Sequence, residues 1–586
     1  MLQWLPEPQK VRYTEGTFPM KDAARVVLKA PCKDERLEEQ VRNLFGEVPL
    51  LLEQGDLYQL FTENGQMPLL QENAWKREEG YTLAVSGEGI ALQASSAAGL
   101  FYGIQTLAQA RRQQECLPGM IVEDWPDFSL RSAHYDLRQT HPPFERLLAY
   151  ISVLASYKYN VLMIEYEDKF PFQEHANLRN GEYCLTQQQV EQLQREAARN
   201  FMEILPLQQS FGHLEYVLKH REYQHLRVTP QQVGEMCPCH EDAYTLACGL
   251  LDEMARQHPD SRYLHLGCDE VWSLGQCPDC KGRMSREMQF IQFVNRLAEH
   301  VISLGKTPML WHDMLMKCTD EELDLLDKRC VVVIWTYLPE GADEIVREFA
   351  PRLAARGIKA LAAPAARCFD WKEIQNYPVL ENRLNNIGSM VESAAECGLS
   401  GIIVTNWTAA FSLGCPYGVY ETTWYPMLYA AQAVWNRSAA KEHFLARFFR
   451  VFHGTALPQN LASKGNAEYF RVIANYEGNL EAHEDAVELF RTMMEYEAAV
   501  FELRVLYRYL YRLEIFPDEP LELQCIQTRY ASPHARFESV REPFAREIEK
   551  YLPSSMAHLF VRSRFYLADR LHKEVYAALE GGTWKD

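Results

Sequence analysis

Between about residues 130 and 435, short apolar runs alternate with longer segments whose apolar residues recur at helical spacing. A short aliphatic run bounded by polar turns predicts a buried strand, whereas a spacing of three and four residues predicts an amphipathic helix. The predicted strands are Ser132–Leu137, Val161–Tyr166, Glu203–Leu207, Tyr263–Gly267, Thr307–Trp311, Val331–Trp335, Lys359–Ala363 and Gly401–Thr405. Helical segments between them include Phe144–Ser156, Gln187–Ala198, Met288–Leu304 and Ile387–Glu396. Eight strands in this alternation favour a (β/α)8 TIM barrel, although a doubly wound open sheet would show the same pattern.

The regions on either side of this pattern differ from it and from each other. Residues 80–96 predict two short strands joined at Gly87-Glu88-Gly89, and a helix follows, which together indicate a small α/β domain. After about residue 436 the strand signals stop, and segments such as EDAVELFRTMMEYEAAVFELRVLYRYLYRLE predict helices. The fold class is therefore α/β: a small α/β domain over residues 1–125, a barrel over 126–435 and a C-terminal helical domain over 436–586.

Composition and charge narrow the classes of partner. Of 586 residues, 47% are hydrophobic and 24% are charged, which is ordinary for a globular protein. The formal net charge of -20 argues against nucleic acid and against an anionic membrane surface, since both are bound through concentrated Lys and Arg. No secretory signal and no apolar run of about 18 residues is seen, so no membrane partner is expected. Fifteen cysteines at irregular spacing favour reduced thiols in a cytoplasmic protein.

The strongest chemical signal is the run Tyr263-Leu264-His265-Leu266-Gly267-Cys268-Asp269-Glu270-Val271-Trp272. Its apolar residues predict a buried strand, and Asp269 and Glu270 stand at the carboxyl end, which faces the active site in a barrel. Adjacent carboxylates resist joint ionisation, so one pKa tends to rise, which suits chemistry that needs one acid and one anion. The alternative is that Asp269 caps the next helix and Glu270 is a solvated residue of its first turn.

Four blocks in order resemble glycoside hydrolase family 20, the β-N-acetylhexosaminidases. The run from His265 to Glu270 resembles the His-x-Gly-(Gly or Ala)-Asp-Glu signature of that family. Residues 80–109 resemble its N-terminal α/β domain, and residues 130–138 resemble its first barrel strand. Thr405-Asn406-Trp407 and Glu421-Thr422-Thr423-Trp424 resemble its last strand and the loop that follows. The resemblance overrides the helix-cap alternative for the two acids.

The resemblance implies a retaining exo-hydrolase of terminal β-linked GlcNAc, or GalNAc, that acts on a small oligosaccharide or glycoconjugate without a cofactor. In this family the 2-acetamido oxygen of the substrate displaces the leaving group and forms an oxazolinium ion. Glu270 then corresponds to the general acid and base, and Asp269 to the anion that orients the acetamide. Glu167 and His213 match positions whose side chains tune the catalytic Glu, although a buried His satisfied by backbone remains an alternative.

The same resemblance suggests substrate-binding residues. Arg138 matches the position that holds the 3- and 4-hydroxyls, with an ion pair to Asp136 as the alternative. Three tryptophans end separate predicted strands and suggest an aromatic wall: Trp311, Trp335 and Trp407. Glu421 is expected to bind a 4- or 6-hydroxyl unless it belongs to a helix cap. The Tyr that holds the acetamide oxygen is not fixed by the pattern, and Tyr337 and Tyr377 are both candidates.

Two cysteine pairs flank the catalytic strand in sequence. Cys277-Pro278-Asp279-Cys280 follows it, and Cys237-Pro238-Cys239 precedes the helix before it. A CxxC pair is a common half of a zinc site, whereas the CxC pair is poorer geometry, so a structural zinc ion and free thiols both remain open.

Two other functions compete with the hydrolase. One is a sugar-binding protein that kept the barrel and lost activity, and the retained Asp269, Glu270 and Arg138 argue against it. The other is a metal-dependent hydrolase, which the sequence does not support because His and Asp residues do not cluster at the predicted strand ends. The sequence gives no indication of the oligomeric state.

Overall fold

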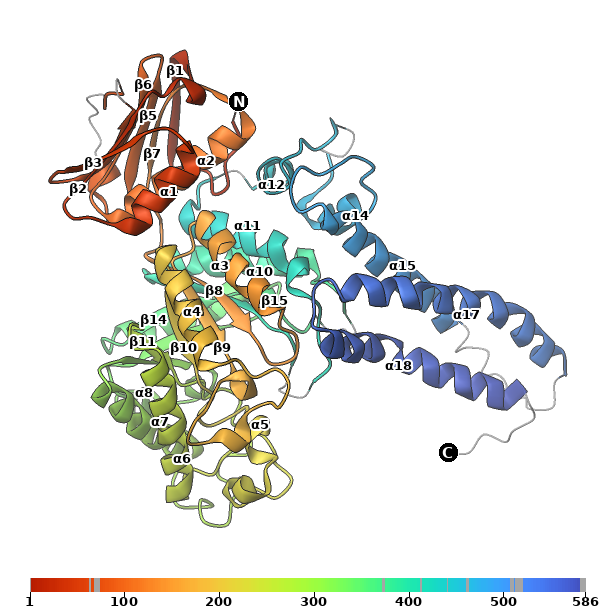
Figure 1. The fold of residues 1–586 in the computed structure, drawn as a ribbon. Coiled ribbons are helices and arrows are strands. Elements are labelled where there is room, and N and C mark those ends of the chain that lie inside the picture. The colour runs from red at the N-terminus through yellow and green to blue at the C-terminus, as the bar shows by residue number, and fades with distance from the viewer. Residues whose placement is uncertain are drawn as a thin grey trace.

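A computed structural model describes residues 2–62, 65–67, 74–370, 375–410, 414–439, 441–459, 463–505, 511 and 520–579. The chain forms an N-terminal sheet with two helices, a closed barrel and a projecting set of C-terminal helices (Figure 1). This arrangement confirms the predicted fold class. The domain boundaries at 125 and 435 remain predictions.

The N-terminal part is a seven-stranded sheet in the order β1-β7-β5-β6-β4-β2-β3. Its strands are β1 (Lys10–Pro19), β2 (Val26–Ala30), β3 (Leu50–Gln54), β4 (Tyr58–Thr62), β5 (Tyr81–Ser86), β6 (Gly89–Ala94) and β7 (Cys116–Asp124). Helices α1 (Glu35–Phe45) and α2 (Ala97–Gln113) pack against each other, and α2 also contacts β5 and β6. The predicted hairpin is present, because Ser86 pairs with Gly89 across a two-residue turn.

Eight parallel strands close into the barrel. They are β8 (Leu130–Asp136), β9 (Val161–Glu165), β10 (Glu203–Leu207), β11 (Tyr263–His265), β12 (Thr307–Trp311), β13 (Val331–Trp335), β14 (Lys359–Ala363) and β16 (Gly401–Asn406). The ring is closed by the pairing of Ala362 on β14 with Ile402 on β16. A short strand, β15 (Ala365–Arg367), continues beyond β14 and also pairs with β16. The carboxyl ends of all eight strands therefore share one rim, which fixes where a site can form.

An outer layer of helices covers the barrel strands. Its main members are α3 (Phe144–Ser156), α4 (Gln187–Arg199), α6 (Glu241–Gln257), α7 (Arg286–Ser303), α9 (Ala342–Ala354), α10 (Leu380–Glu396) and α11 (Trp424–Trp435). Side-chain caps start several of them: the Thr186 side chain accepts from Gln189 N–H, and the Ser285 side chain accepts from Met288 N–H. A hydrophobic cluster fills the barrel interior and includes Met163, Leu205, Met309 and Val333. The strands therefore bury both faces, as their continuous apolar runs predict.

The C-terminal helices are α12 (Phe444–Phe452), α14 (Tyr469–Ala474), α15 (Asp485–Val505), α17 (Pro520–Ile548) and α18 (Ser554–Leu579). In Figure 1, α15, α17 and α18 extend together away from the barrel. They enclose a hydrophobic cluster of their own that includes Leu489, Phe544 and Phe560. Among the described residues, no helix has the length and apolarity needed to cross a membrane.

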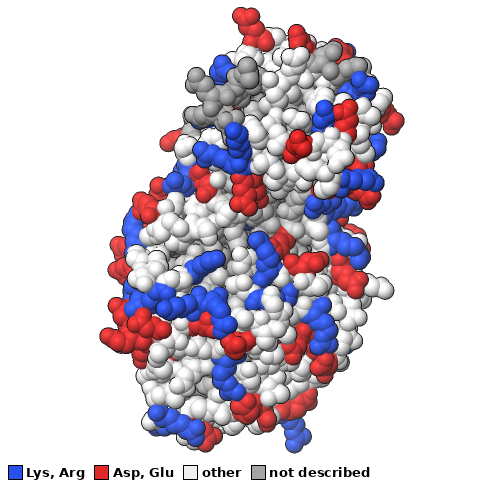
Figure 2. All heavy atoms as spheres, turned by 90° about the vertical axis from the view of Figure 1, so that its left-hand side faces the viewer, with Lys and Arg blue, Asp and Glu red and all other residues white. Residues whose placement is uncertain are grey.

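Charged side chains of both signs are spread over the surface. On the face shown in Figure 2, acidic and basic side chains are interspersed. The surplus of 80 acidic over 60 basic residues is thus not visible there as a single block of charge.

Candidate active site

Asp269 and Glu270 lie on a short segment of unusual backbone at the carboxyl end of β11. The strand ends at His265, two residues earlier than predicted, because Gly267 and Cys268 both have a φ of 69°. Glu270 has a φ of 53°. Left-handed conformations at non-glycine residues cost of order 1 kcal/mol each and persist only where surrounding packing imposes them. The chain therefore leaves the strand abruptly and carries the two carboxylates onto the rim.

His213 joins the two predicted catalytic acids. It lies in the loop after β10, and its Nε2 atom is 3.3 Å from Asp269 Oδ2 and 3.3 Å from Glu270 Oε2. The loop approaches so closely that a Cβ on Gly212 would lie 2.2 Å from the backbone oxygen of Asp269. The Asp269 side chain is 9% exposed, whereas that of Glu270 is 31% exposed. Asp269 is thus an internal anion and Glu270 is accessible from the rim.

His213 and Asp269 shift the pKa of each other. Burial alone would lower the pKa of His213, but Asp269 and Glu270 hold it well above its usual value. Burial alone would raise the pKa of Asp269, but His213 holds it below its usual value. A protonated imidazole therefore compensates the charge of Asp269, which suits the role of the anion that the sequence suggested for this residue.

Asp313, which the sequence analysis did not single out, connects the catalytic acid to the aromatic side chains. It begins a short 3-10 helix, η6 (Asp313–Leu315), directly after β12. Its Oδ2 accepts the backbone N–H of Glu270 at 2.9 Å, and its Oδ1 accepts Nε1–H of Trp335 at 3.3 Å. Burial, followed by the charge of Asp269, raises the pKa of Asp313 to about 7. Asp313 therefore positions the Glu270 backbone through its contact with the backbone N–H.

Glu165 is a second acid that the sequence analysis passed over in favour of Glu167. It ends β9 and is fully buried, with Oε1 accepting from Gln209 Nε2–H at 3.1 Å. Burial, opposed by Arg138, raises the pKa of Glu165 to about 7. Glu167 lies just beyond, at a φ of 47° at the start of η3 (Glu167–Lys169), and is also buried. The sequence predicted that Glu165 and Glu167 lie near the end of a strand, but it did not predict which of them faces the barrel interior.

Arg138 combines the two roles considered for it. Its Nε and Nη2 donate to the two carboxylate oxygens of Asp136 at 3.0 Å each, and Nη2 also donates to Ala409 O at 3.1 Å. Burial alone would raise the pKa of Asp136, but Arg138 lowers it to about 2. The guanidinium also lies 4.9 Å from the ring centre of Trp407. The ion pair is therefore present, and it fixes the guanidinium at the rim, where Nη1 has no acceptor among the described residues.

The three predicted tryptophans form one aromatic series with Tyr337. Trp311 is fully buried, and its ring centre lies 6.1 Å from that of Trp407. Trp407 Nε1 donates to the Tyr337 hydroxyl at 2.8 Å, and the Tyr337 ring stacks on Trp335 with 5.0 Å between centres. The series runs from the barrel interior to half-buried rings at the rim. The other candidate, Tyr377, instead donates to Glu497 on α15, which places it in packing against the C-terminal helices.

Glu421 lies apart from this series. It belongs to η7 (Tyr420–Thr423), and its Oε1 accepts from Arg146 Nη1 at 3.0 Å and from the Tyr150 hydroxyl. Both partners are on α3, in the outer helical layer. These contacts occupy Oε1, whereas the buried Oε2 has no hydrogen-bond partner among the described residues, so the contact with a sugar hydroxyl stays a prediction.

Several buried polar atoms near the rim have no hydrogen-bond partner among the described residues. They are Asp269 Oδ1, Glu165 Oε2, Gln209 Oε1, His265 Nε2, Trp311 Nε1 and the Tyr417 hydroxyl. Leaving such a group unsatisfied costs roughly 1–3 kcal/mol. Tyr417 belongs to the same hydrophobic cluster as Trp407 and was not found from the sequence, because no periodic pattern surrounds it. The concentration of unsatisfied groups in this region indicates a site built for polar ligand groups.

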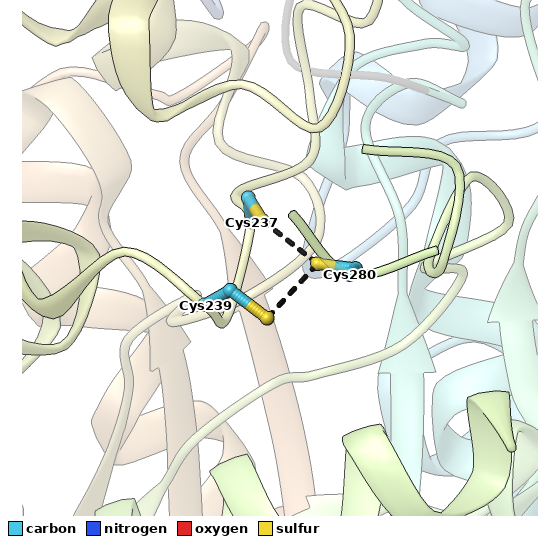
Figure 3. A group of neighbouring side chains, drawn as sticks. All are labelled: Cys237, Cys239 and Cys280. Atoms are coloured by element: carbon cyan, nitrogen blue, oxygen red, sulfur yellow. Dashed lines mark hydrogen bonds between the residues drawn. The ribbon is translucent and has the colours of Figure 1, made fainter. Parts of the chain in front are cut away.

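The four predicted cysteines come together near this rim. The Sγ atom of Cys280 lies 3.0 Å from that of Cys237 and 3.1 Å from that of Cys239 (Figure 3). Cys277 lies close to Cys237 and to His240. Both sulfurs of the CxC pair, expected to be the poorer half of a site, thus lie close to Cys280.

Family models match most of the chain. Residues 2–125 match glycosyl hydrolase family 20, domain 2, and residues 128–396 match the glycosyl hydrolase family 20 catalytic domain. Among curated relatives, hexosaminidase D from Bos taurus is 27% identical over 293 residues, which cover 47% of this chain and 84% of that protein. Human hexosaminidase D is 27% identical over 301 residues, which cover 48% and 60%, respectively. The match thus spans less than two thirds of the human protein.

Solved structures share the fold at low sequence identity. The β-N-acetylhexosaminidase from Bacteroides fragilis superposes with a TM-score of 0.58 at 17% identity, covering 75% of this chain and 92% of that one. The N-acetyl-β-hexosaminidase from Streptomyces plicatus gives 0.57 at 20%, covering 76% and 93%. A chitobiase from Flavobacterium johnsoniae gives 0.59 at 16%, covering 100% and 94%. With its two family domains in order and its acids on the barrel rim, the chain belongs to glycosyl hydrolase family 20 and is a glycoside hydrolase of the hexosaminidase class.

Proposed function

We propose that the protein is a retaining exo-β-N-acetylhexosaminidase that releases terminal β-linked GlcNAc, or GalNAc, by substrate-assisted catalysis. The observation that carries the proposal is the contact of one His213 nitrogen with both Asp269 and Glu270 at 3.3 Å. A family member of this kind needs an anion beside the acetamide N–H and a proton donor beside the leaving oxygen. The more buried Asp269 and the more exposed Glu270 suit these two roles.

In the proposed reaction, Glu270 gives its proton to the departing oxygen while the acetamide oxygen of the substrate bonds to the anomeric carbon. The bond to the leaving group breaks, and positive charge spreads over the oxazolinium ring. Asp269, whose low pKa keeps it ionised, accepts a hydrogen bond from the acetamide nitrogen and stabilises that charge. Glu270, now a carboxylate, takes a proton from water as the water opens the oxazolinium ion. Two displacements at the same carbon retain the β configuration.

Other contacts at the rim support the proposed substrate. The rings of Trp335, Tyr337 and Trp407 offer apolar faces for the sugar and the acetamide methyl group. The Tyr337 hydroxyl lies in this aromatic series, whereas that of Tyr377 donates to Glu497, so we assign the contact with the acetamide oxygen to Tyr337. Arg138, held by Asp136, offers Nη1 to the sugar hydroxyls.

The test is hydrolysis of an aryl β-N-acetylglucosaminide followed by proton NMR of the first-formed sugar. The proposal expects the β anomer first, and competitive inhibition by a thiazoline that resembles the oxazolinium ion. An α product would contradict retention, and turnover of a substrate that lacks the acetamide carbonyl at an equal rate would contradict substrate assistance. No hydrolysis of any aryl hexosaminide, with retained binding of GlcNAc, would favour the non-catalytic sugar-binding alternative.

Substrate range follows from a panel of aryl glycosides that differ at the 4- and 6-positions. Equal kcat/KM for the 4-epimers would mean that Arg138 tolerates both GlcNAc and GalNAc. We also propose a cytoplasmic location, which fits the many cysteines, and short oligosaccharides as the substrates met there. Fractionation of the cells that make the protein tests the location directly.

A further inference from the structure

Four cysteine side chains from two separate loops converge in a way that the hydrolytic reaction does not require. Cys237 and Cys239 lie between η5 (Arg221–Leu226) and α6, while Cys277 and Cys280 lie in the loop between β11 and α7. The ligand atoms of Cys237, Cys239 and Cys280 are all within 4.8 Å of one another. Those of Cys237, Cys277 and His240 satisfy the same limit. In Figure 3 the Cys237 and Cys239 side chains point toward that of Cys280.

We propose that Cys237, Cys239, Cys277 and Cys280 bind one structural Zn²⁺ ion. Zinc takes four thiolates in a tetrahedron with Zn–S bonds of about 2.3 Å, which places the sulfurs about 3.8 Å apart. The observed separations of 3.0 and 3.1 Å are within about 1 Å of that arrangement. Four soft sulfur donors select zinc over the harder cations magnesium and calcium. Three of the four sulfurs are therefore already close together, and Cys277 joins them through its proximity to Cys237.

The surroundings of the sulfurs support an ion rather than a disulfide. Cys280 has two thiols at nearly equal distance, and a disulfide at about 2.05 Å could use only one of them. Cys237, Cys277 and Cys280 are buried in a small cluster with Val228, while Cys239 is exposed. The backbone N–H of Asp279 points at Cys277 Sγ from 3.3 Å, an interaction that favours the thiolate. One vertex at the surface leaves a path by which the ion can enter.

The proposed ion would join the two loops that shape the catalytic centre. The segment next to Cys237 holds the His213 loop, because Gly234 O accepts from Leu214 N at 2.9 Å and Met236 N donates to Phe211 O at 3.1 Å. Glu235 also accepts from the backbone N–H and the hydroxyl of Ser273, at 2.8 and 2.6 Å. Ser273 lies between Glu270 and Cys277 in the chain. A zinc ion at the cysteines would thus fix one end of a connection whose other end positions His213 and Glu270.

The direct test is the metal content of the full chain purified with a reductant and without chelators. About one zinc per chain is expected for the wild type, and a loss of most of it for Cys277→Ser and Cys280→Ser. Two matched controls should keep their zinc: Cys32→Ser, which changes an exposed thiol of the N-terminal domain, and His240→Ala, which removes the neighbouring donor that the proposal leaves out. Absence of zinc in the wild type even after zinc supplementation, iron in its place, or full zinc in both cysteine variants would overturn the proposal.

A second measurement uses only the wild-type protein, so it does not require that the cysteine variants fold. A mercurial thiol reagent is added stepwise to the wild type in the presence of a chromogenic zinc indicator. The site is supported if zinc release is complete once four protected thiols have reacted. It is also supported if exchange of the metal for cobalt(II) gives the visible absorption spectrum of a tetrahedral cobalt(II) thiolate. A mass of the unreduced protein that is lower than the mass of the reduced chain by the hydrogens of one or two disulfides would contradict the zinc site. Neither readout depends on hydrolysis, so the proposed catalytic function can fail while the zinc site stands.

Discussion

The two ends of the barrel differ in whether their buried polar side chains have hydrogen-bond partners within the protein. At the amino end, Lys158 donates to Asp124 at 2.6 Å and lies 4.3 Å from the ring centre of Trp435. Asp124 accepts further bonds from Tyr81 at 2.6 Å and from Trp435 at 2.8 Å. None of these four side chains has a buried polar atom left without a partner. At the carboxyl end, Asp269, Glu165, Gln209 and Trp311 each retain an unsatisfied buried atom.

This difference indicates that the polar groups at the amino end stabilise the fold, whereas those at the carboxyl end are available to a ligand. The amino-end pair ties the barrel to the N-terminal domain, since Asp124 ends β7 and Lys158 lies just before β9. Its charges are fully compensated by protein groups, so little is left for a ligand to gain. At the carboxyl end, groups remain unsatisfied at a cost in stability, which a substrate can recover on binding. This is the division expected for a barrel, with stability at one end and chemistry at the other.

The largest effect is expected from removing the catalytic acids, which should break the chemistry and leave the fold intact. Asp269→Asn should raise the barrier by about 3–4 kcal/mol, since it removes the charged contact to the oxazolinium ion. Glu270→Gln should lower kcat by about 10²–10⁴-fold on glycosides with poor leaving groups and much less on activated aryl glycosides. Steady-state kinetics with both substrate types measures this, and thermal unfolding serves as the control. Equal losses on both leaving groups would contradict the acid role of Glu270.

The matched change at the amino end should do the reverse. Lys158→Met leaves Asp124 as a buried carboxylate without its cation, and breaking a buried pair in this way typically costs about 3–5 kcal/mol of unfolding free energy. Urea titration measures the loss, and kcat of the folded fraction should change little. Lys33→Met, which breaks an exposed pair with Glu35, is the control and should leave the stability unchanged. If Lys158→Met lost most of its kcat and kept its full stability, the assignment of stability to the amino end and chemistry to the carboxyl end would be wrong.

The fold was predictable from the sequence because each barrel strand is a short apolar run and each covering helix has its own periodicity. Thr307–Trp311 and Val331–Trp335 were predicted to the residue. The end of β11 was missed, since a left-handed turn at Gly267 and Cys268 leaves no mark in hydrophobic periodicity. A Cβ at Gly267 would lie 1.9 Å from Gln209 Oε1, a constraint that arises only in the folded rim.

The site was predictable only in part, for a similar reason. Asp269, Glu270, His213 and Arg138 could be named because a motif or a strand end marks them. Asp313 and Glu165 act through contacts between strands that the order of residues along the chain does not display. The lowered pKa of Asp269 also could not be predicted from its neighbours in the sequence, because it depends on His213 from a different loop.

An intermediate effect is expected from His213→Asn, which removes the cation from between the two acids. Without it, repulsion should raise the pKa of Asp269, so the acidic limb of the pH profile of kcat/KM should move to higher pH. A loss of kcat of about 10–100-fold is typical when a residue that tunes a catalytic group is removed. Loss of activity with an unshifted profile would instead indicate that His213 only supports the loop.

The smallest effect is expected from changing Glu165. It measures how much stability the protein loses by burying an ionisable carboxyl group at the carboxyl end of the barrel. Burial raises the pKa of Glu165 to about 7 in the folded state, above its value in the unfolded chain. At intermediate pH, Glu165 is therefore protonated more in the folded state than in the unfolded chain. Its contribution to the stability is greatest at low pH and falls as the pH rises toward 7, above which the full loss remains.

Glu165→Gln keeps an oxygen that can accept from Gln209 and cannot ionise, so relative to the wild type it should gain about 2 kcal/mol of unfolding free energy between pH 5.5 and pH 8. Urea titrations of both proteins at the two pH values measure the difference. Titrations at other groups, such as Asp313, cancel because both proteins share them. A difference that stays constant with pH would show that Glu165 is ionised throughout and that Arg138 compensates it, as Lys158 does for Asp124 at the other end of the barrel.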